Sequence, residues 1–194
     1  MAIGDPYISI TNLKPRIGNP TGQDAILTSI VDAASRMIER WTCRQFNKSA
    51  MAEPKYLTAR YRYEIDLPDV VSISEIAVDA GTRTYDTVWE ATDFDLTPFD
   101  PRAGYPYTGV QVAPTGTVLF GFSPRGVRVT AIWGWPAVPA PIVEATALQA
   151  TRLYKRKDAP FGVIGSTELG QLMTISKIDP DVKSMIAPYR VMVL

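Results

Sequence analysis

The sequence predicts an α+β protein, a small α-helical bundle core that carries a large antiparallel β insertion. The prediction rests on a change of pattern along the chain. Apolar residues recur at helical spacing in residues 21–46, alternate and become β-branched or aromatic in residues 47–135, and return to helical spacing in residues 136–188. A chain of 194 residues is long enough for one substantial domain with such an insertion.

The first helix is predicted to begin with Thr21 as N-cap, because Asp24 follows three residues later as in a capping box. Its apolar positions recur at helical spacing, and they are Ile26, Ile30, Ala33, Ala34, Met37, Ile38 and Trp41. The helix runs into the segment IERWTCRQF, residues 38–46, which we interpret as a junction between two pieces of structure. We expect a buried apolar set there, Ile38, Trp41 and Phe46, and two exposed or salt-bridged cations, Arg40 and Arg44.

The central region is expected to form roughly five or six strands joined by hairpin-like turns. The predicted strands are KYLTARYRYEIDL, VVSISEIAVD, YDTVWEATDFDLT, TVLFGF and VRVTAIWGW. The turn signals between them are Pro68-Asp69, Ala80-Gly81, Pro101 with Gly104, Pro114 with Gly116, and Pro124 to Gly126. Together they predict a small antiparallel sheet or barrel.

The segment PAVPAPIVEATALQATRLYKRKDAP predicts a second long helix, with Pro141 in its first turn and Glu144 complementing the positive helix end. Two apolar stripes run along it, one formed by Ile142, Ala145 and Leu148 and the other by Val143, Ala147, Ala150 and Tyr154. The glycine-containing segment FGVIGSTELGQLMTIS is expected to be a loop. A short helix then follows Asp179-Pro180-Asp181 and stops at Pro188.

The two ends of the chain are predicted to lack structure of their own. Residues 1–20 contain several Gly and Pro residues and are expected to form an extended N-terminal arm. Residues 189–194, YRVMVL, form an apolar C-terminal tail. No signal peptide is visible, and the most apolar stretch is broken by prolines, so no membrane segment is expected.

The composition argues against an enzyme. The chain has no histidine and one cysteine, Cys43, which excludes a Ser-His-Asp triad and a cysteine-built zinc site within it. We therefore predict no catalytic, cofactor-binding or metal-binding residues and no cofactor. Lys plus Arg and Asp plus Glu are equal at 20 each, so the chain has no basic excess for gripping DNA tightly.

Other interpretations of individual motifs remain open at this point. The acidic run Glu90, Asp93, Asp95 and Asp100 suits either a calcium or acid/base site or a solvated strand face, and it lacks the glycine and glutamate of the common calcium loop. Trp133 and Trp135 are either a stacking platform of a β-rich module that binds carbohydrate or protein, or part of the core. The cluster RLYKRK either complements a helix dipole or contacts an acidic partner or a phosphate backbone.

Several segments, taken in order, resemble tailed-phage head–tail connector proteins of the adaptor type, also called head-completion proteins, which have relatives in gene-transfer agents. The matching segments are IERWTCRQF, DFDLTPFD, VRVTAIWGWPAVPAPIVEATALQATRLYKRKDAPFG and DPDVKSMIAPYRV. The resemblance covers the order of elements from about Thr21 to Val191. The arm does not align, the β insertion is large, and Cys43 stands where a small residue such as glycine is expected.

The resemblance implies a structural virion protein of the neck, made in the host cytoplasm, that forms a dodecameric ring under the portal. It implies portal protein and a stopper or tail-terminator protein as partners, with double-stranded DNA passing through the lumen without specific binding and no contact with a membrane. For such contacts we predict residues of the arm, the second long helix and the tail. They are Tyr7, Ile8, Ile10, Val143, Ala147, Ala150, Arg152, Lys155, Arg156, Lys157, Tyr189, Arg190, Val191, Met192 and Val193. We expect one apolar stripe of the second long helix to face its own core and the other a neighbouring subunit, with the arm and the tail ordered only by partners.

Overall fold

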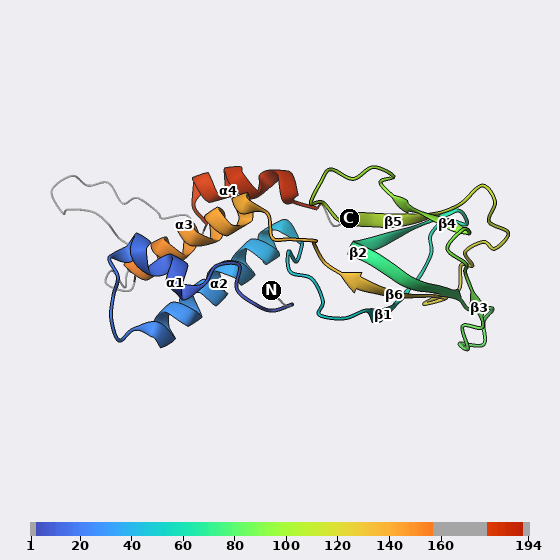
Figure 1. Cartoon of the computed structure of the whole chain (residues 1–194), viewed down its shortest axis with the longest axis horizontal. Helices are drawn as coiled ribbons and strands as arrows, with labels where there is room; N and C mark the ends of the chain where they lie inside the picture. The colour runs from blue at the N-terminus through green and yellow to red at the C-terminus, as the bar shows by residue number, and fades with distance from the viewer. Residues whose placement is uncertain (1–2, 157–177, 192–194) are drawn as a thin grey trace, which may run out of the picture. The chain divides into compact units, whose positions relative to one another are not determined.

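The computed structural model describes residues 3–156 and 178–191 and confirms the α+β class (Figure 1). The chain divides into two compact units. The β unit comprises Gln45–Ala137 with Met1–Gly4, and the helical unit comprises Asp5–Arg44 and Val138–Leu194. The chain therefore passes from one unit to the other inside the segment IERWTCRQF, between Arg44 and Gln45.

The helical unit is built from two long helices and several short ones. Their bounds are α1 Ile10–Leu13, the 3-10 helix η1 Lys14–Ile17, α2 Asp24–Thr42, α3 Ala140–Arg156, α4 Pro180–Ile186 and the 3-10 helix η2 Ala187–Tyr189. One cluster joins α1, α2 and α3, and its fully or nearly fully buried members are Ile8, Leu13, Leu27, Val31, Ala34, Ala147 and Ala150. Short apolar side chains on α3 let α2 approach it closely.

The start of α2 differs from the prediction. The helix begins at Asp24, with Gln23 at the N-cap position and no capping hydrogen bond from its side chain. Gly22, at φ +69°, keeps the preceding chain out of the helix. Asp24 pairs with Lys14 of η1 at 2.7 Å, so it serves an ion pair instead of a capping box with Thr21.

The buried face of α2 is also shifted from the predicted one. Leu27 and Val31 are inside, whereas Ile26 is 50% exposed and Ala33 is exposed. At the junction, Ile38 and Phe46 are buried as predicted, but Trp41 is only half-buried. The helix ends at Thr42, and the C-cap residue Cys43 adopts the left-handed conformation at φ +54°. That is the conformation glycine favours after a helix, which explains why glycine is expected there.

The β unit is one six-stranded antiparallel sheet in the order β1-β6-β2-β5-β4, with β3 paired to β2. The strands are β1 Glu53–Leu57, β2 Glu64–Val78, β3 Thr87–Val88, β4 Phe94–Thr97, β5 Tyr107–Val112 and β6 Val127–Trp133. The first part of β2 pairs with β5 and the second part with β6. Inward-facing residues of both parts enclose one core, to which β6 gives Val127, Val129, Ala131 and Trp133.

Several predicted strand limits are wrong. The expected turn at Pro68-Asp69 is instead an irregularity within β2, between Asp66 and Val70, which lets one strand continue and change partners. The long segments predicted as single strands around Tyr61 and Trp89 each divide into two. The segment TVLFGF is not a strand, although Phe120 within it is buried.

Gly134, at the end of β6, is required by the close approach of another segment. It adopts φ +104°, and a Cβ added there would lie 1.9 Å from the Asn47 carbonyl oxygen. Its own N–H donates to Asp69 O at 2.7 Å. A side chain at this position would push the 47–48 backbone off the end of β6.

We predict that Gly134→Ala lowers the free energy of unfolding of the β unit by roughly 3–5 kcal/mol, because the added methyl meets backbone that cannot rotate away. Urea denaturation followed by tryptophan fluorescence measures this. Gly121→Ala is the matched control, since an added Cβ there has nothing within 4 Å. Equal stability of the two variants would contradict the packing described.

Candidate functional site

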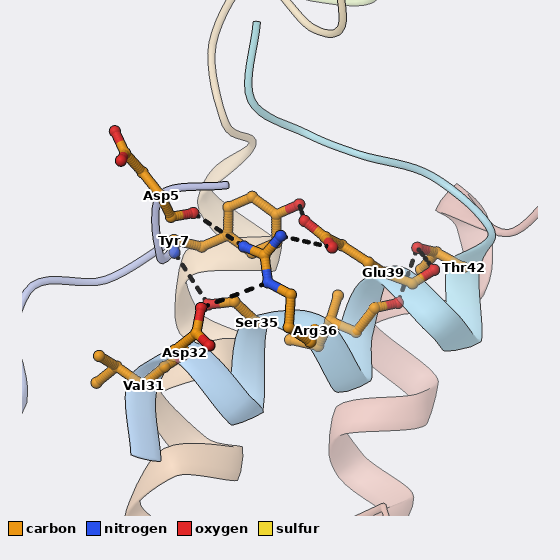
Figure 2. A network of polar contacts seen from close by, with 9 residues as sticks. Asp5, Tyr7, Val31, Asp32, Ser35, Arg36, Glu39 and Thr42 are labelled. Atoms are coloured by element: carbon orange, nitrogen blue, oxygen red, sulfur yellow. Dashed lines mark hydrogen bonds and ion pairs between the residues drawn. The ribbon is translucent and has the colours of Figure 1, made fainter. Parts of the chain in front are cut away.

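The N-terminal arm is docked on α2 by a polar network (Figure 2). The Tyr7 N–H donates to Ser35 Oγ at 3.0 Å, and the Tyr7 hydroxyl donates to Glu39 Oε1 at 2.5 Å. Arg36 holds the same carboxylate at 2.8 Å and also donates to the Asp5 carbonyl oxygen at 3.1 Å. Because Tyr7 is 1% and Ile8 4% exposed, the expectation that the arm finds partners only outside the chain is wrong for these residues.

A second anchor fixes the arm to α3. Arg16 of η1 makes two parallel hydrogen bonds to the Glu144 carboxylate, at 2.6 and 2.7 Å. This bonding holds the pKa of Glu144 below its usual value and raises the pKa of Arg16. Glu144 was expected to complement the helix dipole, whereas its direct partner is a cation of the arm. Ile10 is half-buried and packs on the same apolar cluster.

Both apolar stripes of α3 are largely covered within the helical unit. Ala147 and Ala150 are fully buried against α1 and α2, and Ile142 and Ala145 of the other stripe are also fully buried. Val143 is half-buried, and Leu148 is 40% exposed. Ala147 and Ala150, which were expected to face a neighbouring subunit, are therefore covered within the chain, because the folded-back arm packs on that side of α3.

The basic end of α3 is tied to the short helix α4. Arg152 pairs with Asp179 Oδ2 at 2.6 Å, while Asp179 Oδ1 caps α4 by accepting the Asp181 N–H at 3.0 Å. The predicted cap of the terminal short helix is therefore confirmed. Lys155 is exposed and Arg156 half-buried, and Lys157 lies outside the described residues, as does the predicted loop FGVIGSTELGQLMTIS.

The first residues of the C-terminal tail contact α2. The Val191 N–H donates to the Thr42 carbonyl oxygen at 2.9 Å, and the Arg190 guanidinium lies 5.2 Å from the centre of the Trp41 ring. Tyr189 is half-buried in η2. The tail was expected to order only on a partner, and this is wrong for Arg190 and Val191. Met192 and Val193 lie outside the described residues.

An apolar stripe on α2 is left partly uncovered, and sequence reasoning assigned it to the core. Ile26 is 50% exposed, Ala33 is exposed, and Ile30 and Met37 between them are half-buried. These residues lie three or four positions apart, so they form one line beside the buried face. The sequence does contain a signal for this uncovered stripe, because the apolar face of α2 is wider than packing against one partner requires.

In the β unit, the two tryptophans of the alternative binding-module interpretation are both core residues. Trp133 and Trp135 are each 1% exposed, and their indole N–H groups donate to Glu53 O at 2.7 Å and Asp69 Oδ2 at 2.8 Å. Trp135 also packs against the Phe46 ring, with centroids 5.2 Å apart. A stacking platform formed by them is therefore wrong.

Of the acidic run, Asp95 lies in β4 and is exposed, while its neighbours Phe94 and Leu96 pack against the core, which agrees with a solvated strand face. Within residues 3–156 and 178–191, no group of three or more His, Cys, Asp or Glu side chains is arranged to hold a metal ion. In the same ranges, no helix is both long and apolar enough to cross a membrane.

The chain is similar in fold to solved structures, but its sequence matches no known family. No family model matches the sequence. No curated protein matches it either. A chain in a structure of the neck of an empty GTA particle, computed with C6 symmetry, is 18% identical with a TM-score of 0.59, covering 100% of this chain and 95% of that one.

Two further solved structures give the same result. A chain in the virion of a native gene transfer agent (GTA) particle is 16% identical with a TM-score of 0.58, covering 100% of this chain and 95% of that one. A chain in the neck of a native GTA particle, computed with C12 symmetry, is 20% identical with a TM-score of 0.55, covering 100% and 94%. The chain has the fold of a GTA neck protein. The resemblance predicted from the sequence is thus confirmed at the level of the fold.

The match spans both units of this chain, because it covers the whole length.

We predict that the Arg16–Glu144 pair stabilises the helical unit at pH values above the ordinary pKa of glutamate, about 4.3. This contribution is lost as the pH falls through the lowered pKa of Glu144. Glu144→Gln should cost about 0.2–1 kcal/mol near neutral pH, because the pair is solvent-exposed. Chemical denaturation at several pH values measures this.

The stability difference between wild type and Glu144→Gln should fall toward zero as pH is lowered from about 6 to about 2. Glu90→Gln, at an exposed carboxylate of the β unit outside this pair, is the control and should leave the stability of the helical unit unchanged. A Glu144 difference independent of pH would contradict the ion pair.

Proposed function

We propose that this chain is a structural protein of a phage-like particle neck, a head–tail connector adaptor that forms a ring under the portal. The observation that carries the proposal is the full-length fold match to chains in GTA neck structures, at TM-scores of 0.55 and 0.59. In this role the chain acts by position and shape and catalyses no reaction. Its place is the virion neck, between the capsid vertex and the tail.

The symmetry of the neighbouring structures supports a ring. Those necks were computed with C6 and C12 symmetry, and a ring of identical copies repeats one heterologous contact around its axis. Such a contact needs apolar surface that the single copy leaves open. The stripe of Ile26, Ile30, Ala33 and Met37 on α2 offers it, and Leu148 and Val143 on α3 add exposed or half-exposed apolar surface.

The proposed partners above and below the ring are the portal protein and a stopper or tail-terminator protein, with double-stranded DNA passing through the lumen. Equal numbers of acidic and basic residues, 20 each, suit a conduit that DNA crosses without adhering. The surfaces for these partners are expected among the exposed residues near α3's basic end and the tail, including Lys155 and Arg190.

Electron microscopy of the purified chain, alone and mixed with the portal of its own particle, tests the proposal. We predict closed rings, and we predict that Ile26→Glu reduces them because a charge then enters the apolar contact. Thr28→Glu, also exposed on α2, is the matched control and should assemble like wild type. A wild-type chain that stays monomeric and binds no portal would overturn the proposed function.

A further inference from the structure

The β unit contains a pocket that the proposed function has not used. Its volume is 390 Å³, and it opens beside β4 and β5. Two of its lining side chains are aromatic and unusually exposed, Tyr63 at 62% and Phe99 at 64%. Exposed aromatic rings at a pocket are typical of contact sites, since a large apolar area is available there with few rotatable bonds to freeze.

The pocket also has a defined charge. Asp95 lines it from β4 and lies opposite Gln111 of β5, which in turn lies opposite Glu64 of β2. Residues directly paired across antiparallel strands share a face, so two carboxylates flank one amide on the same face of the sheet. The exposed Asp95 carboxylate makes no hydrogen bond or ion pair with any residue in the described ranges. An aromatic pocket with a free carboxylate suits a guanidinium group, which stacks on rings and binds carboxylates.

The same unit shows how it accommodates arginine next to aromatic rings. The Arg125 guanidinium lies 5.1 Å from the centre of the Tyr56 ring, and that of Arg128 lies 5.3 Å from the centre of the Tyr85 ring while bonding Glu75 at 2.9 Å. In the part of the chain that is described, no cation occupies the equivalent position over Tyr63 or Phe99. The pocket thus has the chemistry of an arginine site without an arginine from its own copy.

A free arginine is displayed at another place on the same unit. Arg83 lies in the loop between β2 and β3 and adopts the left-handed conformation at φ +63°, held by a hydrogen bond from its N–H to Asp79 Oδ1 at 2.6 Å. Asp79 is itself 7% exposed and donates its N–H to Gly126 O, so two loops support this conformation. The exposed Arg83 guanidinium makes no ion pair with any residue that the structure describes.

We propose that Arg83 of one copy inserts into the pocket of the next copy in the ring, stacking on Tyr63 and Phe99 and pairing with Asp95. The proposal deepens the proposed function and rests on it. The pocket is lined from β4 and β5, whereas the Arg83 loop follows the part of β2 that pairs with β6. One copy therefore presents the inserting group and the receiving pocket at different places, as a heterologous contact requires.

Charge reversal tests the contact on the full chain. We expect Asp95→Arg to raise the protein concentration at which half of the chains are assembled into rings by about tenfold or more, because two guanidinium groups then meet. Mass photometry over a concentration series measures this. Glu53→Arg reverses an exposed carboxylate on β1 outside the pocket and should assemble like wild type. Circular dichroism checks that each variant folds. Asp95→Asn, a near-isosteric change, should also weaken ring formation.

The decisive variant combines Asp95→Arg with Arg83→Asp, which restores opposite charges at every contact in the ring. Recovery of assembly to within about threefold of wild type supports the proposal, because coupling of this kind is expected only of groups that meet. Rings unaffected by Asp95→Arg and Asp95→Asn, or a double variant that fails to recover, would overturn this contact and leave the neck assignment intact. A wild-type chain that forms no rings, alone or with portal, would overturn both.

Discussion

The helical unit depends on the docking of its N-terminal arm onto α2 and α3. The Tyr7 backbone N–H donates to Ser35 of α2, and the Tyr7 hydroxyl donates to Glu39 of α2. Arg36 of α2 pairs with the same Glu39 carboxylate. Ser35 is fully buried, and its hydroxyl both accepts the Tyr7 N–H and donates to the Val31 carbonyl oxygen, so this buried polar group is fully paired. With the arm in place, Ile8 and Leu13 cover the alanines of α3.

The docked arm and tail give these segments contacts within the single subunit. A chain whose arm and tail lacked partners would be incomplete until neighbouring copies surrounded it. Instead, Tyr7 and Ile8 of the arm are buried, and the Val191 N–H of the tail donates to Thr42 of α2. Both segments therefore contact the chain's own helices. The proposed function therefore rests on the full-length fold match, and the proposed assembly would use surface that remains exposed on a folded subunit. Association of preformed subunits costs less conformational entropy than coupled folding.

The sequence predicted the features that local rules control. The helix and strand regions followed from apolar periodicity, the cap of α4 from Asp179-Pro180, and the family resemblance from the order of short motifs. The register of α2 was wrong because its apolar face is wider than its contact with α3, and periodicity alone does not show which part of it is covered. A strand that crosses Pro68 was missed because a bulge there depends on two different partner strands.

The pocket in the β unit was outside the reach of sequence reasoning for a related reason. Asp95 and Gln111 come from β4 and β5, while Tyr63 and Phe99 lie just before β2 and just after β4, and only the sheet order brings them together. A solvated strand face was one of the two interpretations open for Asp95, and its aromatic neighbours were not foreseen. Contacts of this kind arise from non-local pairing, which a single sequence does not encode in any short window.

Hydrogen exchange at the Tyr7 amide in the isolated monomer tests the central claim most directly. That N–H donates to the buried Ser35 Oγ at 3.0 Å, so the docked arm should slow its exchange by at least about a hundredfold relative to an unstructured peptide. Exchange at the unstructured rate in the monomer, with protection appearing only after assembly, would contradict a helical unit completed by its own arm.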